Sequence, residues 1–239
     1  MHPRGRIPQT LTIDEEIVRL SGRRRPRALF IPTASLDDPD YCRALGALYG
    51  GRLGCEIDTL LLYRERPSPA QARAKILESD IIYVGGGNTL RMMRLWRHLG
   101  IDRALDLARR RGKVLCGLSA GAICWFRQGN SDSRKFANSE NKTLIKVTGL
   151  GFADLLLCPH YDVERHRQPA LRDMMRRMPG VAIALDNCAA IEIVHDRYRI
   201  LTSAKRKNAY RVFWKNGRYF RQVLEKDGEY RSLSSLLEI

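Results

Sequence analysis

Short apolar runs alternate with helical patterns along the first half of the chain, and two of these runs end in glycine-rich turns. Ile81–Val84 leads into Gly85–Gly87, and the run ending at Cys116 leads into a Gly-x-Ser-x-Gly sequence. Helical patterns follow the two turns, over Thr89–Leu99 and from about Ala120 to Phe126. Strand, turn and helix repeated in this order predict an α/β fold with a mostly parallel sheet that helices cover on both faces.

The remaining segments extend this pattern and then change it. Further strands are predicted at Arg27–Thr33 and Glu56–Tyr63, and further helices at Asp38–Tyr49, Ser68–Leu77 and Asp102–Arg111. The C-terminal third holds short β-rich runs at Val181–Leu185, Ala189–Val194, Tyr198–Thr202, Tyr210–Trp214 and Tyr219–Val223. Asn216-Gly217 separates the last two runs, and this dipeptide is typical of a two-residue hairpin. We therefore predict an antiparallel C-terminal extension on the parallel sheet, within one domain over residues 1–239.

The charge of the chain is strongly basic. It has 42 Lys and Arg against 26 Asp and Glu, a formal net charge of +16. Nucleic-acid-binding proteins have such a balance, but here the basic residues are spread along the chain and no DNA- or RNA-binding motif accompanies them. We therefore expect a solvated, arginine-rich surface and no specific nucleic-acid partner. Any binding of RNA would involve phosphates alone and would be lost as salt rises.

Composition also limits the class of protein. Hydrophobic residues make up 44% of the chain, which allows a sizeable core and excludes intrinsic disorder. No apolar run approaches the ~20 residues of a membrane span, and the N-terminal residues lack the apolar stretch of a signal peptide. We expect a cytoplasmic protein with no membrane partner. The cysteines form no C-x-x-C pair, so we predict reduced core thiols and neither disulfides nor a metal site.

The Gly-x-Ser-x-Gly sequence, Gly117–Gly121, carries the sharpest chemical signal. It lies between an apolar strand and a helix, which is the context that a nucleophile elbow requires. Small residues let the chain turn sharply there and hold the Ser119 hydroxyl out of the sheet, while the backbone N–H of Ala120 faces a developing oxyanion. The pattern predicts Ser119 as a nucleophile. The alternative is a tight turn that serves packing alone.

The second turn, Gly85–Thr89, also follows an apolar strand and precedes a helix. It is neither a G-x-G-x-x-G sequence nor a P-loop, which argues against a dinucleotide or nucleotide-phosphate site. Ligands of α/β sheets bind at the carboxyl ends of the strands, so we expect this turn to act together with Ser119. An amide of Gly86 or Gly87 would then join that of Ala120 in the oxyanion hole. A turn needed only for packing is the alternative.

A serine nucleophile needs a base, and the chain has five histidines. Only His160 closely follows an apolar strand, Leu155–Cys158, so we predict His160 as the base. Asp132 lies in a predicted polar loop after the elbow helix, and the order Ser, Asp, His is found with nucleophile elbows, so Asp132 is the predicted acid of the triad. Other carboxylates stay open for that role: Asp154, Asp162, Glu164, Asp186 and Glu192.

These motifs together resemble the peptidase E family of serine peptidases, which contains the α-aspartyl dipeptidases and the cyanophycinases. The resemblance rests on Gly85–Thr89, on Gly117–Ala122 and on Pro159-His160-Tyr161, and it runs from about Ile31 to Asn216. Two further stretches, Cys124–Phe126 and Leu185–Ala190, resemble the peptidase E-like branch more than cyanophycinase. The resemblance implies a fold like that of class I glutamine amidotransferases, with a flavodoxin-like sheet and the nucleophile on a strained turn.

The resemblance also implies an activity. We expect hydrolysis of small peptides with an N-terminal aspartate through an acyl-enzyme, with Ser119 as nucleophile, His160 as base and Asp132 as acid. Arg167 matches an arginine that binds the aspartate side chain of the substrate, with Arg165 as the alternative, and we place Asn88 beside it among the substrate-binding residues. No cofactor or metal is implied, and a homodimer is left open. The alternatives are a cyanophycinase-like or other amide hydrolase, or a catalytically silent basic binding protein.

The start of the chain departs from the family pattern. Relatives begin with a hydrophobic strand and a small polar or glycine-rich loop, whereas this chain begins Met1-His2-Pro3 and reaches a helix near Leu11. We therefore predict that the usual first strand is missing, and that the gene encodes an apolar strand and a glycine-rich turn in frame upstream of Met1.

Overall fold

The computed structural model describes residues 9–141, 143–164 and 166–239. These residues form two compact units, which we call the elbow unit (residues 17–154) and the histidine unit (residues 9–16 and 155–239) after Ser119 and His160. The division falls inside helix α1 (Leu11–Leu20) and inside strand β7 (Ala153–Cys158). Across the described residues, no helix is both long and apolar enough to cross a membrane.

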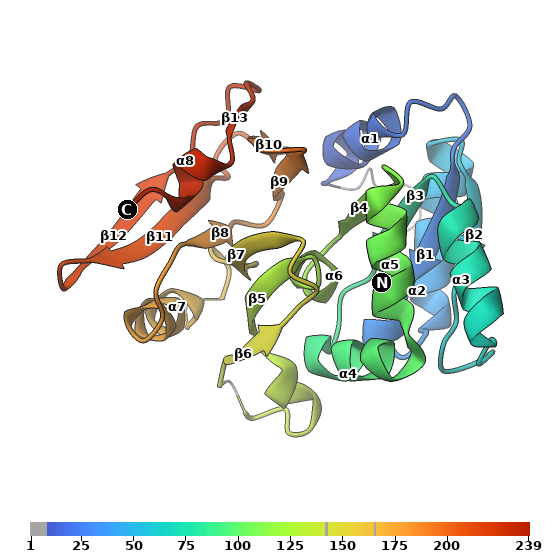
Figure 1. Cartoon of the computed structure of the whole chain (residues 1–239), viewed down its shortest axis with the longest axis horizontal. Coiled ribbons are helices and arrows are strands. Elements are labelled where there is room, and N and C mark those ends of the chain that lie inside the picture. The colour runs from blue at the N-terminus through green and yellow to red at the C-terminus, as the bar shows by residue number, and fades with distance from the viewer. Residues whose placement is uncertain (1–8, 142, 165) are drawn as a thin grey trace. The chain divides into compact units, whose positions relative to one another are not determined.

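A four-stranded parallel sheet forms the centre of the elbow unit (Figure 1). Its strands are β1 (Arg27–Ile31), β2 (Glu56–Thr59), β3 (Ile81–Val84) and β4 (Val114–Gly117), in the order β2-β1-β3-β4. The predicted parallel pairing is confirmed, and the order is the beginning of a flavodoxin-like sheet. Since all four strands run in the same direction, the turns that follow β3 and β4 emerge at one edge of the sheet.

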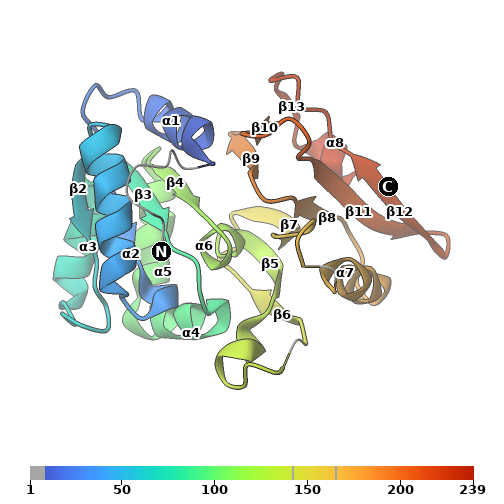
Figure 2. The ribbon, with the colours of Figure 1, turned by 180° about the vertical axis from the view of Figure 1, so that it is seen from behind.

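Helices cover both faces of this sheet. They are α2 (Pro39–Gly46) with its continuation η2 (Ala47–Arg52), α3 (Pro69–Glu78), α4 (Thr89–Leu99), α5 (Ile101–Arg110) and α6 (Ala120–Ile123), with the short helices η1 (Thr33–Ser35) and η3 (Ser133–Phe136). Figures 1 and 2 show α3 and α5 on one face and α2 on the other. On the α2 face, Leu45 and Tyr49 pack with Ala28 and Phe30 of β1. A capping box between Ser68 and Gln71 begins α3.

The predicted elbow helix is too long at its C-terminal end. Helix α6 ends at Ile123, and strand β5 (Phe126–Ser131) follows and pairs antiparallel with β6 (Ile145–Thr148). The polar sequence expected to be a loop is therefore mostly strand, and Asp132 lies between β5 and η3. Its polar sequence is not typical of a buried strand. The buried polar side chains are tolerated because they are hydrogen-bonded; Ser131 Oγ, for example, donates to Thr89 Oγ1 over 3.1 Å.

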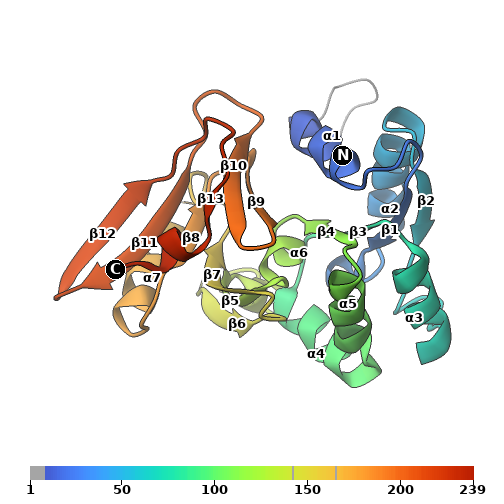
Figure 3. The same cartoon turned by 45° about the horizontal axis from the view of Figure 1, so that its top comes forward.

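The histidine unit is mostly β-structure. Strands β7, β8 (Ala182–Leu185), β11 (Ala209–Lys215) and β12 (Arg218–Val223) form a mixed arrangement in the order β12-β11-β8-β7, with β7 and β8 parallel. Strands β9 (Ala189–Val194), β10 (Arg197–Thr202) and β13 (Arg231–Ser232) form an antiparallel sheet. Figure 3 shows the hairpins β9–β10 and β11–β12. Helix α7 (Arg167–Arg176) packs Leu171 and Met175 into the core against β8, and α8 (Ser234–Leu237) ends the unit's helices.

The predicted Asn216-Gly217 hairpin is confirmed, but the antiparallel C-terminal strands belong to the mixed sheet and to the antiparallel sheet, and they do not extend the four-stranded parallel sheet as predicted. Lys215 pairs with Arg218, and the turn residues Asn216 and Gly217 have φ of 50° and 74°, as a type I′ hairpin requires. The structure thus has an α/β fold with a parallel four-stranded sheet, a mixed sheet and an antiparallel sheet. The predicted helix near Leu11 is present as α1. The predicted loss of an earlier strand stays a prediction, since Met1, His2 and Pro3 lie outside the described residues.

Candidate active site

Ser119 has the backbone conformation of a nucleophile elbow. It links the end of β4 to the start of α6 and has φ of 55° and ψ of −114°. A serine rarely adopts a positive φ, and such strain persists only where the surroundings impose it. Ser119 is partly exposed. The predicted sharp turn between a strand and a helix is therefore present at Gly117–Gly121.

Close backbone packing explains why both Gly117 and Gly121 of this turn are glycine. A Cβ on Gly117 would lie 2.5 Å from the carbonyl oxygen of Val84, and one on Gly121 would lie 2.0 Å from the same oxygen. Neither position can hold a larger residue without moving β3 or the turn. The glycines thus let α6 begin directly against the end of β3, which fixes the direction of the Ser119 backbone.

The second glycine turn lies against Ser119, as the parallel sheet leads us to expect. A Cβ on Gly86 would lie 3.3 Å from Cβ of Ser119, and Gly87 has φ of 140° and packs on the carbonyl of Ala34. The backbone N–H of Gly86 donates to the Tyr41 hydroxyl over 3.3 Å. Of the two predicted oxyanion donors in this turn, Gly86 is therefore engaged within the unit. The roles of Gly86, Gly87 and Ala120 stay predictions.

Asn88, predicted to bind substrate, is buried at the N-terminus of α4. Its Oδ1 accepts from the backbone N–H of Arg91 over 3.0 Å, and its Nδ2 donates to the carbonyl of Ser133 over 3.4 Å. An asparagine at this position caps a helix. These contacts favour a structural role for Asn88, and substrate binding stays a prediction.

Asp132, the predicted acid of the triad, belongs to the elbow unit, whereas His160 belongs to the histidine unit. The Asp132 carboxylate forms an ion pair with Lys135 of the same turn. Its predicted partnership with His160 stays a prediction.

His160 lies just beyond β7, and its ring has a partner that the sequence analysis did not predict. Nδ1 of His160 lies 2.8 Å from Oδ1 of Asn187, which follows β8. Strands β7 and β8 pair in parallel with Cys158 opposite Ala184, so the two turns that follow them leave one edge of the sheet together. The sequence contains a signal for this contact, because Asn187 follows the predicted strand Val181–Leu185 as His160 follows Leu155–Cys158. The predicted partners of His160, however, are all carboxylates, whereas Asn187 is an amide.

The carboxylate of Asp162 holds the backbone of Asn187 in place. Asp162 accepts a hydrogen bond from the backbone N–H of Asn187 over 2.8 Å and an ion pair from Lys207. Burial raises the pKa of Asp162, but the hydrogen bonds from Lys207 and Asn187 outweigh it and hold this pKa below its usual value. His160, Asn187, Asp162 and Lys207 thus form one hydrogen-bonded chain within the unit.

Arg167 begins α7 and is almost fully buried, with 1% of the residue exposed. Its Nε donates to Glu164 Oε2 over 2.6 Å. The same guanidinium lies beside the Cys158 thiol, whose pKa burial raises to about 12. A buried guanidinium of this kind holds a carboxylate firmly, and in this structure that carboxylate belongs to Glu164. The alternative substrate arginine, Arg165, lies outside the described residues.

Glu192, another carboxylate that the sequence left open, is also paired. It is 8% exposed, accepts from Arg199 over 2.9 Å and 3.1 Å, and accepts from the Tyr230 hydroxyl. Arg199 in turn pairs with Glu16 of α1. These contacts link the β9–β10 hairpin to Glu16, and they favour a structural role for Glu192.

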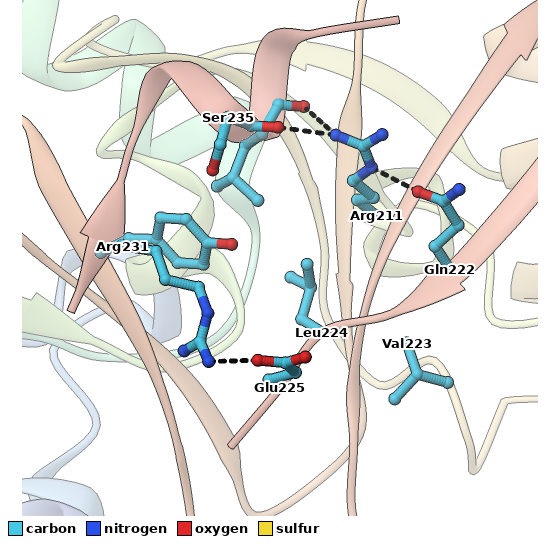
Figure 4. Close-up of a pocket in the computed structure, with 9 residues that line it drawn as sticks. Arg211, Gln222, Val223, Leu224, Glu225, Arg231 and Ser235 are labelled. Carbon is cyan, nitrogen blue, oxygen red and sulfur yellow. Dashed lines mark hydrogen bonds and ion pairs between the residues drawn. The ribbon is translucent and has the colours of Figure 1, made fainter. Parts of the chain in front are cut away.

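A hollow of about 200 Å³ lies among the last strands of the histidine unit (Figure 4). Arg211 donates there to Gln222 over 2.6 Å and to the carbonyl of Ser235 over 2.7 Å, and Arg231 pairs with Glu225. Figure 4 shows these side chains directed toward one another. The arginines are therefore engaged within the protein, which argues against this hollow as the site for an acidic peptide.

Comparison with known proteins points to one family. Residues 5–201 match the model of peptidase family S51. The chain is 35% identical over 207 residues to "Uncharacterized peptidase YgaJ" of Bacillus subtilis (strain 168), covering 86% of each chain. Among solved structures it is similar to a peptidase from an acI-B1 Actinobacterium, with a TM-score of 0.71, 19% identity, and 95% and 92% of the two chains covered. It is also similar to a "Putative Peptidase E Protein" from Listeria monocytogenes EGD-e, with a TM-score of 0.62, 22% identity, and 81% and 93% covered.

Proposed function

Since the chain belongs to peptidase family S51, a family of serine peptidases, we propose that it hydrolyses small peptides that begin with aspartate. The single observation that carries the proposal is the strained Ser119 elbow, with φ of 55° and with Gly86 against its Cβ. A serine held in this way at the start of a helix presents its hydroxyl outward and directs backbone amides to one place.

In the proposed reaction, Ser119 Oγ attacks the peptide carbonyl while His160 takes its proton. The amides of Ala120 and Gly87 stabilise the oxyanion, with Gly86 contributing if it releases Tyr41. His160 then protonates the leaving amine, and water hydrolyses the acyl-enzyme. Each bond change involves a side chain or amide of the chain itself.

Selection of an N-terminal aspartate is assigned to Arg167. Its buried guanidinium already binds a carboxylate, that of Glu164, and Glu164 is the more exposed of the two side chains. We propose that the substrate carboxylate replaces Glu164 on Arg167. A charge-assisted bond in such surroundings distinguishes aspartate from asparagine, because asparagine has no charge to pair.

The test is a panel of dipeptides assayed with the wild type, Ser119→Ala and His160→Ala. We expect cleavage of Asp-X peptides and a loss on the order of a million-fold in kcat in either variant, the size seen on removing a nucleophile or base from another serine protease. Circular dichroism and thermal melting of both variants should match the wild type. Retention of more than about a tenth of the wild-type kcat would exclude Ser119 as nucleophile.

A further substrate, a covalent probe and an RNA-binding measurement separate the alternatives. Preferential cleavage of β-aspartyl-arginine over Asp-X peptides would indicate a cyanophycinase-like enzyme. Failure of a fluorophosphonate probe to label Ser119, together with submicromolar binding of RNA at physiological salt, would indicate a silent binding protein. Weak RNA binding that disappears as salt rises is expected from the net charge alone.

A further inference from the structure

We propose that Asn187 orients His160, at the place where serine peptidases commonly use a carboxylate. The catalytic meaning of this inference rests on the proposed function, whereas its geometry rests on the 2.8 Å contact between His160 Nδ1 and Asn187 Oδ1. An amide oxygen only accepts hydrogen bonds, so the ring proton must be on Nδ1. Nε2 is then unprotonated and free to accept a proton, as a general base requires.

The fold positions both partners through main-chain contacts. Cys158 of β7 lies opposite Ala184 of the parallel strand β8, and the N–H of Tyr161 donates to the carbonyl of Leu185 over 3.0 Å beyond that pair. His160 itself has φ of 57°, so the backbone turns away from the extended conformation of β7 at this residue. Backbone contacts thus hold the loops after β7 and β8 together, independently of the contact between the His160 and Asn187 side chains.

The backbone of Asn187 is fixed by Asp162. The carboxylate accepts the Asn187 N–H over 2.8 Å and is held in place by Lys207. Asp162 therefore acts on His160 through Asn187. The Asp162 carboxylate thus contacts Asn187, and the neutral Asn187 side chain, rather than the carboxylate, contacts the imidazole of His160.

The carboxylates of the histidine unit that the sequence left open as the triad acid have other partners in the structure. Asp162 binds Asn187 N–H and Lys207, Glu164 binds Arg167, Asp186 accepts from the backbone N–H of Asn208 and Glu192 binds Arg199 and Tyr230. The His160 ring instead has Asn187 Oδ1 at 2.8 Å from its Nδ1.

The neutrality of Asn187 has a consequence for pH dependence. A carboxylate on Nδ1 would favour the protonated, inactive imidazolium through its charge, whereas an amide fixes the same tautomer without that charge. Asn187→Asp should therefore move the acidic limb of the kcat/KM profile to higher pH. Asn187→Ala should lower kcat/KM by about a hundredfold, the cost of a base that is no longer held in its productive geometry.

The decisive experiment measures the ring directly. The ¹⁵N chemical shifts of His160 are recorded in protein with labelled histidine, in a Ser119→Ala background so that catalysis plays no part, and the signal is assigned with His160→Gln. We expect the Nδ1–H tautomer when Asn187 is present and a mixture of tautomers in Asn187→Ala. An unchanged tautomer in Asn187→Ala would overturn the proposal.

A matched control variant completes the test. Asn216→Asp introduces the same charge into the β11–β12 turn, where Asp-Gly is tolerated, and should leave the acidic limb in place; an equal movement in both Asp variants would contradict an effect transmitted through His160. If the tautomer responds to Asn187 but the wild type cleaves no peptide, the proposed function fails while the role of Asn187 stands.

Discussion

The turns that carry Ser119 and His160 are held in place by different kinds of force. Around Ser119 the constraint is backbone packing: Gly117 and Gly121 lie so close to the carbonyl of Val84 that neither has room for a Cβ. Around His160, polar side chains act in addition to the backbone contacts between the two loops, with Asn187 on the ring and Asp162 on the Asn187 backbone. Both residues have positive φ, at 55° and 57°.

This difference has a general consequence for the two positions. A turn fixed by close backbone packing tolerates no added atom, but it contains no charge and is insensitive to pH. A turn fixed by polar side chains accepts isosteric changes, but its stability depends on charge. Steric substitutions should therefore damage the Ser119 turn most, and charge substitutions should affect the His160 turn most.

The largest effect is expected for Gly121→Ala. The new Cβ would lie 2.0 Å from the Val84 carbonyl oxygen, so β3 and the elbow must separate. We expect a loss of about 3 kcal/mol in the free energy of unfolding, the upper part of the usual range for overpacking, measured by urea denaturation. Gly46→Ala is the control, because that glycine is helical and open, and alanine there should stabilise by about 0.5–1 kcal/mol. Equal stabilities of the two variants would contradict the packing argument.

The same contrast explains how far the sequence alone could lead. The Gly-x-Ser-x-Gly turn was predictable because the glycines that it requires, Gly117 and Gly121, lie within five consecutive residues of the chain. The Asn216-Gly217 hairpin was predictable for the same reason. Local backbone requirements leave a residue signature that requires no knowledge of distant contacts.

The surroundings of His160 were only partly predictable. That His160 follows a strand could be predicted, but Asn187 reaches it through the parallel pairing of β7 with β8, which involves segments distant in sequence. Strand β5 was missed because Gly129, Asn130 and Ser131 are polar or small, and only their tertiary partners make them a buried strand. Long-range pairing and satisfied buried polar groups leave no comparable local signature.

A smaller effect, specific to substrate, is expected for Arg167→Met. Loss of a charge-assisted bond to the substrate carboxylate is worth roughly 1.5–3 kcal/mol, or about ten- to a hundred-and-fifty-fold in kcat/KM. Activity on Asp-X peptides should fall by this factor, and activity on Asn-X peptides far less. Arg176→Met, at an exposed position of the same helix, is the control. An equal loss on both substrates would show that Arg167 serves only to hold Glu164.

The smallest effect should appear in Asp162→Asn, and it should depend on pH. The pKa of Asp162 in the folded protein lies below its usual value of 3.8 because hydrogen bonds from Lys207 and Asn187 outweigh the effect of burial. A lowered pKa means that the charged carboxylate stabilises the fold above about pH 4, and that this stabilisation is lost as pH falls through the folded-state pKa. Lys207 has a raised pKa from the same pair, so its contribution is present below its usual value of 10.5 and is lost as pH rises through the folded-state pKa.

Urea denaturation of the wild type and Asp162→Asn at pH 7, 5 and 3 tests this window. The variant retains an oxygen that can accept from the Asn187 N–H, so it removes the charge while sparing the hydrogen bond. We expect the wild type to be modestly more stable at pH 7 and 5, because partly exposed ion pairs contribute little, and we expect the difference to shrink at pH 3. Lys207→Met should show the same dependence, and the double variant should be no less stable than either single one, since both remove a single interaction. A stability difference that stays constant down to pH 3 would mean that Asp162 acts through its shape and hydrogen bonds alone, and the contrast between a charge-dependent and a packing-dependent turn would then no longer hold.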